Sequence, residues 1–179
     1  NESLPAHPYA SLTPDVVLHA VESAGFLADG RQLALNSYEN RVYQVGLEED
    51  QGGPLGEARF LVAKFYRPGR WTDEQILEEH GFAAELAGRE IPVVPALEIG
   101  GTTLHHHAGF RFSVYPRRGG RAPELEDRNT LEWLGRFIGR IHAVGATKPF
   151  VHRPGIDVAS FGTASRDWLL EHDFIPADL

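Results

Sequence analysis

Hydrophobic and polar positions divide the chain into a strand-rich first part and a helical second part. Apolar residues recur at helical spacing between Thr13 and Gly25, and Thr13 is followed by the Pro-Asp pair typical of a helix start. The stretches 31–35 and 41–47 have strand character and are joined by a short polar segment, which predicts a β-hairpin. The apolar run 60–66 predicts a strand that is buried on both faces.

A second helix is marked by its first turn. Thr72 and Gln75 have the spacing of a capping box, and acidic residues follow the cap, so we expect a helix that ends near Gly88. Beyond it, two short strands are expected around the glycine turn 100–101, and a further strand over 110–115.

A basic, glycine-containing break at 116–121 separates these strands from two later helices. The first is expected over 131–144, and the second lies within 157–170. In the first of them, four residues have core spacing, namely Leu131, Leu134, Ile138 and Ile141. The pattern predicts an α+β fold with a loose arm at 1–12, an antiparallel sheet with one long helix at 13–116, and a hinge followed by helices at 117–179.

Lys64 lies in the middle of the most apolar predicted strand and is one of only two lysines in the chain. A buried ammonium group needs a partner, because leaving it unpaired costs several kcal/mol. Three readings are open: a lysine satisfied by a structural carboxylate or by reaching solvent, a point charge for phosphate, and a nucleophile. Glu79 is the candidate partner, since it shares the apolar face of the following helix with Ile76, Ala83 and Leu86.

Composition narrows the class of protein. Hydrophobic residues make up 42% of the chain and charged residues 23%, which is typical of a globular domain. The chain has no cysteine, which excludes disulfides and cysteine-based zinc sites. The net charge of −8 disfavours nucleic acid and anionic membranes as partners, and no stretch has the length of a membrane span. We expect a cytoplasmic monomer.

The run His105-His106-His107 resembles a metal-binding motif. On a strand, however, three consecutive side chains alternate between the two faces, and no carboxylate follows at a useful spacing. We therefore expect no metal ligand within this chain.

Several segments resemble the aminoglycoside-phosphotransferase-like kinases. The segment 36–43 resembles their nucleotide-binding hairpin, Val62-Ala63-Lys64 their third-strand lysine, and the spacing from Glu79 to Ile91-Pro92 their helix glutamate and the connection after it. More narrowly, four collinear segments resemble bacterial stress-response Ser/Thr kinases of the SrkA (RdoA) type, namely 35–44, 64–68, 75–80 and 151–154. The resemblance runs from about Leu12 to Leu179. It implies a protein-kinase-like N-lobe, a hinge and the first helices of the C-lobe.

The resemblance also implies a site for ATP. In that family a lysine held by a carboxylate meets the α- and β-phosphates, a hairpin turn covers the phosphates, and hinge backbone groups meet the adenine edge. The positions that match in this chain are Asn36, Ser37, Tyr38 and Asn40 in the turn, Val42 as an apolar lid, the pair Lys64 and Glu79, and Val114, Tyr115 and Arg117 at the hinge.

The chain departs from the family at the catalytic loop. Neither the pattern His-x-Asp-x-x-x-x-Asn nor an aspartate-containing magnesium motif occurs in it. We expect the general base and the Mg²⁺ ligands to lie beyond Leu179, so this chain has no catalytic residue of its own and does not turn over alone. The resemblance implies an ATP- and Mg²⁺-dependent kinase that phosphorylates Ser or Thr of proteins. The alternatives are a kinase of the same fold acting on an aminoglycoside, choline-like or sugar-like alcohol, and an inactive nucleotide-binding module.

Overall fold

The computed structural model describes residues 7–48, 55–56 and 58–174, in two compact units that divide between Pro149 and Phe150. Its elements are α1 (Pro14–Ser23), β1 (Ala28–Leu35), β2 (Arg41–Leu47), β3 (Phe60–Phe65), α2 (Asp73–Gly88), β4 (His105–His107), β5 (Phe110–Pro116), α3 (Arg128–Gly145), a π-helical turn (Ala159–Thr163) and α4 (Ala164–Glu171). No helix within the described ranges is long and apolar enough to cross a membrane.

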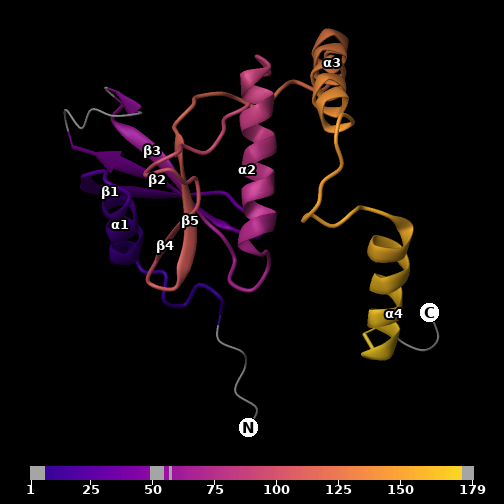
Figure 1. The fold of residues 1–179 in the computed structure, drawn as a ribbon, viewed down its shortest axis with the longest axis horizontal. Coiled ribbons are helices and arrows are strands. Elements are labelled where there is room, and N and C mark those ends of the chain that lie inside the picture. Colours follow the sequence, from indigo (N-terminus) through magenta and orange to yellow (C-terminus); the bar gives the residue numbers. More distant parts are fainter. Residues whose placement is uncertain (1–6, 49–54, 57, 175–179) are drawn as a thin grey trace. The chain divides into compact units, whose positions relative to one another are not determined.

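The first unit is built on an antiparallel sheet with the strand order β1-β2-β3-β5-β4. β3 is the central strand, and Lys64 on it pairs with Val42 of β2 and with Ser113 of β5. Figure 1 shows α1 and α2 on the two sides of β5. The sheet therefore has one face toward each helix.

The core lies on the α1 face of the sheet. Leu61, Ala63 and Phe65 of β3 are fully buried there, together with Val17 and Val21 of α1. The intervening residues of β3 are only half-buried. The prediction of a strand buried on both faces was therefore wrong, because the second face of β3 is open to a pocket beside α2.

Both predicted helix starts are confirmed. Thr13 accepts a hydrogen bond from the Val16 amide, and Pro14 opens α1. At α2 the capping box is complete: Thr72 Oγ1 accepts from the Gln75 amide at 3.3 Å, and Gln75 Oε1 accepts from the Thr72 amide at 2.9 Å. These bonds satisfy amide groups that a helix start otherwise leaves without a partner.

Part of the expected loose arm is packed. Tyr9 and Leu12 are buried in the core, and the Tyr9 ring stacks on Phe110. The Tyr9 hydroxyl donates to the Glu39 carbonyl oxygen at 3.0 Å, so this segment is attached to the β1–β2 turn. Residues 1–6 of the expected arm lie outside the described residues.

The expected pair of strands around residues 100–101 is reduced to a single bridge between Ile99 and Thr102. Gly100 and Gly101 both have positive φ angles, as a two-residue hairpin turn requires, but the pairing does not continue beyond this bridge. The strand that follows, β4, begins only at His105.

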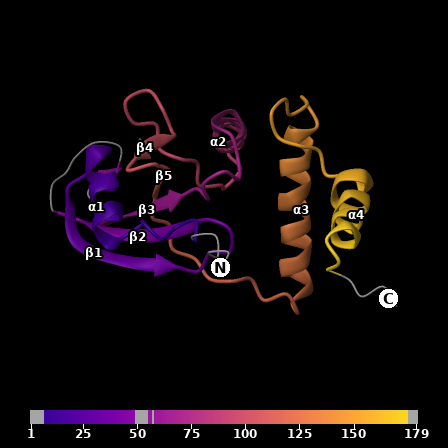
Figure 2. The ribbon, with the colours of Figure 1, turned by 90° about the horizontal axis from the view of Figure 1, so that it is seen from below.

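α3 packs against α2 through its C-terminal part, and Figure 2 shows α2 nearly end-on where α3 is seen along its length. Val144 is buried against Leu86 and Ile91, and Lys148 Nζ lies 2.6 Å from Glu85 Oε2. α3 therefore belongs to the first compact unit, although we expect the hinge between kinase lobes to precede it.

The expected core spacing of α3 is only partly right. Leu131 and Ile138 are about half exposed, whereas the helix buries Val144 and partly buries Phe137 and Ile141. Only the C-terminal turns of α3 reach α2, so the apolar residues near its start have no such cover within the described part of the first unit.

Candidate functional site

A pocket of about 300 Å³ lies between the second face of the sheet and α2. Strands β2, β3 and β5, helix α2 and the segment after it all contribute to its wall. The lining residues are Val42, Val62, Lys64, Glu79, His80, Ala83, Val94, Ala96 and Tyr115. The wall is thus mainly apolar. Its polar residues are the charged pair Lys64 and Glu79 and the side chains of His80 and Tyr115.

Lys64 and Glu79 form the charged pair in this pocket. Lys64 Nζ lies 3.3 Å from Glu79 Oε1, and it also lies 4.8 Å from the centroid of the Tyr66 ring. The Lys64 side chain is 22% exposed. The ammonium group therefore has a carboxylate and an aromatic face as partners and is still accessible from the pocket, which suits a fixed point charge for an anion.

A hydrogen-bonded cluster of neutral groups lies beside the pair. His80 Nε2 is 2.7 Å from the Tyr66 hydroxyl, and His80 Nδ1 is 2.8 Å from Thr103 Oγ1. The Tyr115 hydroxyl is 3.3 Å from that of Tyr66. Sequence reasoning missed this cluster. The signal for it was a histidine directly after Glu79 on the inward side of a capped helix.

Burial sets the charge state of this cluster. Burial lowers the pKa of His80 to about 4, although the nearby Glu79 carboxylate acts in the opposite direction. Burial also raises the pKa of Tyr115 well above its usual value. At neutral pH His80 and Tyr115 are therefore uncharged.

The predicted turn residues lie close to Lys64 along the sheet, because Val42, which pairs with Lys64, comes two residues after Asn40. Ser37 Oγ donates to the Asn40 carbonyl oxygen at 2.8 Å, and Asn40 Oδ1 accepts from the Arg67 amide at 3.3 Å. Tyr38 is fully exposed at the tip, and Asn36 is also exposed. None of these four predicted residues lines the pocket, whereas Val42 does.

The three predicted hinge residues have different surroundings. Tyr115 lines the pocket. Val114 instead points into the core on the other face, and its carbonyl oxygen accepts from the Leu97 amide at 2.8 Å. Arg117 lies on the surface, where its Nε donates to Gln44 Oε1 at 3.0 Å. The structure therefore brings one of the three to the pocket.

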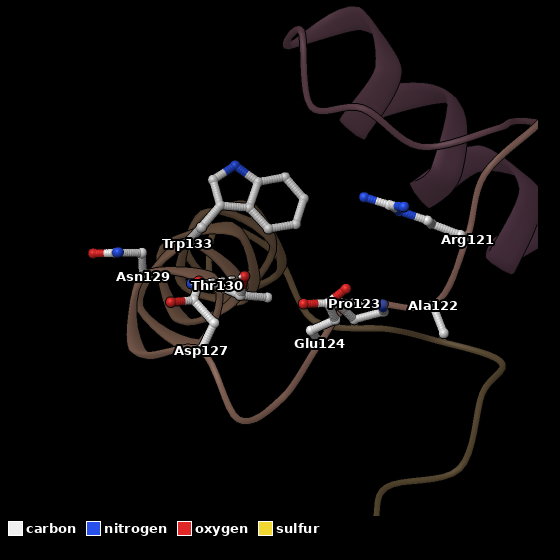
Figure 3. A pocket seen from close by; sticks show the side chains of 8 residues that line it. All are labelled: Arg121, Ala122, Pro123, Glu124, Asp127, Asn129, Thr130 and Trp133. Carbon is white, nitrogen blue, oxygen red and sulfur yellow. Dashed lines mark hydrogen bonds between the residues drawn. The ribbon is translucent and has the colours of Figure 1, made fainter.

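A second hollow, of about 450 Å³, lies where the segment after β5 meets the start of α3 (Figure 3). The Arg121 side chain points from that segment toward the Trp133 indole. Asp127 is used locally, because Oδ2 accepts from the amide and the hydroxyl of Thr130, each at 2.8 Å, and these bonds lower its pKa. The cation of this hollow, Arg121, is exposed, whereas Lys64 in the first pocket is half-buried.

No group of three potential metal ligands occurs among the residues that the structure describes. The three histidines of β4 alternate between faces as expected, and His106 Nε2 lies 3.2 Å from Asp73 Oδ2. The expectation that the Mg²⁺ ligands lie beyond Leu179 stays a prediction.

A model of the phosphotransferase enzyme family (APH) matches residues 30–173, so the chain belongs to this family. It is 40% identical over 174 residues to stress response kinase A of Escherichia coli K12, covering 97% of this chain and 51% of that protein. It is 38% identical over 172 residues to the serine/threonine protein kinase RdoA of Salmonella typhimurium, covering 96% of this chain and 50% of that protein.

Among solved structures, the chain is similar to the amicoumacin kinase hAmiN, solved in complex with AMP-PNP, Ca²⁺ and Ami. The TM-score is 0.63 at 20% sequence identity, over 92% of this chain and 49% of that one. The likeness shows a shared fold, so the prediction of an α+β, kinase-like N-lobe is confirmed. The chain spans about half the length of the curated relatives that it matches.

Proposed function

We propose that the chain is the nucleotide-binding part of an ATP-dependent kinase of bacterial stress response that phosphorylates Ser or Thr of proteins. The observation that carries the proposal is the Lys64–Glu79 pair, 3.3 Å apart inside a mainly apolar pocket. An apolar slot with one half-buried cation fits a nucleotide, which combines a flat aromatic base with a polyanionic tail.

Each part of the wall has a role in this proposal. Lys64 binds the α- and β-phosphates as a point charge, and Glu79 keeps the ammonium group in place. Val42, Val62 and Ala96 provide apolar contact for adenine. In this proposal the chain thus binds and orients ATP. The group that accepts the hydroxyl proton and the Mg²⁺ ligands are proposed to lie outside this chain.

The acceptor is proposed to be a protein hydroxyl, because the relatives at 38–40% identity carry the names of a stress response kinase and of a Ser/Thr protein kinase. The second candidate is a small-molecule alcohol, since the chain shares its fold with the amicoumacin kinase. In either case we propose a cytoplasmic monomer without nucleic-acid or membrane partners.

Replacing Lys64 with alanine tests the nucleotide site. We expect Lys64→Ala to weaken ATP binding about ten- to a hundredfold, because a charge-assisted hydrogen bond to phosphate is lost. We expect the free energy of unfolding to change by less than about 1 kcal/mol, since the partner Glu79 is 39% exposed and water can solvate it. Isothermal titration calorimetry and urea unfolding measure the two quantities.

The matched control is Lys148→Ala, which removes the other lysine of the chain and its ion pair with Glu85 outside the pocket. It should leave ATP affinity unchanged. Equal affinities for the wild type and Lys64→Ala, or a loss of stability with no ATP binding in the wild type, would refute the proposed site.

A further inference from the structure

The β1–β2 turn carries a carboxylate at an unexpected place. Glu39 lies in the segment proposed to cover the phosphates of ATP, where a free negative charge would repel them. In the structure this carboxylate points to the loop between β3 and α2. Glu39 Oε2 accepts from Arg70 Nε at 2.8 Å, and Glu39 Oε1 accepts from Trp71 Nε1 at 2.7 Å. These three residues are called the Glu39 clamp below.

The charge of Glu39 is compensated within this clamp. Burial acts to raise the pKa of Glu39, but the hydrogen bonds from Arg70 and Trp71 outweigh it and hold the pKa below its usual range. The carboxylate therefore stays ionised beside a cation. Its negative charge is directed away from the tip of the turn, where Tyr38 is fully exposed.

Further hydrogen bonds hold the turn at the same place. The Glu39 carbonyl oxygen accepts from the Tyr9 hydroxyl at 3.0 Å, and Asn40 Oδ1 accepts from the Arg67 amide at 3.3 Å. No glycine occurs from Asn36 to Asn40. A turn without glycine that is bonded on several sides has little conformational freedom left to lose when a ligand binds.

The clamp also reaches the start of α2. Trp71 packs against Tyr66 and Ile76, and it directly precedes Thr72, the N-cap of α2. The helix that begins there carries Glu79. The turn, the start of α2 and the partner of Lys64 are thus connected through one short loop.

We infer that Glu39 is a positioning residue that fixes the β1–β2 turn over the phosphate end of the nucleotide pocket. The inference rests on the proposed function, because it assigns a role to Glu39 in the same ATP site. It predicts that the clamp contributes to the binding of the triphosphate and not to the binding of the nucleoside. A residue that only supports the fold would affect both alike.

The experiment compares ATP with adenosine on the whole chain. For Glu39→Ala we expect ATP affinity to fall about tenfold and adenosine affinity to change less than twofold, because the turn loses its preorganised position. Glu39→Gln keeps an acceptor for Trp71 but loses the charge that pairs with Arg70. Its ATP affinity should therefore lie between those of the wild type and of Glu39→Ala. This second variant also serves if Glu39→Ala fails to fold.

Glu132→Ala is the control, since it also removes one carboxylate bonded to arginine side chains, but on α3. It should leave both affinities as they are. Equal losses of ATP and adenosine binding in the Glu39 variants, or no loss of either, would overturn the positioning role while leaving the nucleotide site intact. A wild type that binds neither ligand would refute the proposed function itself, and the role of Glu39 would fall with it.

Discussion

At the scale of single residues, His80 has properties that only its surroundings explain. Its imidazole is 5% exposed, bonded to Tyr66 and Thr103, and has a pKa lowered from 6.5 to about 4 mainly by burial. The unfolded chain exposes the same ring at its ordinary pKa. Between these two values the unfolded state binds more protons than the folded state, so acid favours unfolding.

The expected result is a pH-dependent stability. The contribution of His80 is complete above about pH 6.5 and is lost as the pH falls toward about 4, by up to roughly 3 kcal/mol in the free energy of unfolding. Urea unfolding between pH 7 and pH 5 measures the first part of this loss, about 2 kcal/mol in the free energy of unfolding. His80→Gln should flatten this part of the curve, whereas His142→Gln, at an exposed position on α3, should not. Parallel curves for all three proteins would contradict the assignment.

The Lys64–Glu79 contact could be predicted from the sequence, while the cluster around His80 could not. A strand alternates its side chains and a helix repeats every 3.6 residues, so the position of an inward carboxylate after an inward lysine follows from local rules. His80 is bonded to Tyr66, which directly follows β3, and its other partners come from β5 and from the segment at Thr103. Only the folded sheet brings them to α2.

At the scale of elements, the capping box fixes where α2 begins. Thr72→Ala removes the acceptor for the Gln75 amide, and we expect a loss of about 1 kcal/mol in the free energy of unfolding. Thr72→Ser keeps the hydroxyl, so its free energy of unfolding should fall by about a few tenths of a kcal/mol at most. Chemical denaturation followed by circular dichroism compares the three proteins. Equal stability of the alanine and serine variants would show that the cap contributes nothing.

The starts of α1 and α2 and the end of α2 were predicted well because caps are local, whereas α3 begins at Arg128, three residues before its expected start. Thr13, Thr72 and Gly88 mark ends that the structure confirms. The two strands expected around 100–101 were predicted wrongly, because apolar alternation does not tell whether a neighbouring strand is available for pairing. Val114 shows the same limit within β5, since its side chain and carbonyl group are both engaged away from the pocket.

At the scale of the whole molecule, α3 is attached to the sheet-bearing part through α2. Val144 is 6% exposed and packs with Leu86 and Ile91, so we expect Val144→Ala to lower the free energy of unfolding by about 1 to 3 kcal/mol. Leu131→Ala, at a half-exposed apolar position on the same helix, should cost less than about 1 kcal/mol. Urea unfolding followed by tryptophan fluorescence gives both values. Equal losses would mean that α3 is not held at its C-terminal end.

The sequence by itself determined the helix caps, the hairpin, the Lys64–Glu79 pairing and the resemblance to a kinase family, because each depends on residues close together in the chain or on short collinear motifs. The tertiary structure decided which face of β3 is open, which hinge residue reaches the pocket, that Tyr9 is packed, and that Glu39 is bonded to Arg70 and Trp71. These features depend on contacts between segments tens of residues apart, whose pairing is set by packing of the whole sheet and its helices.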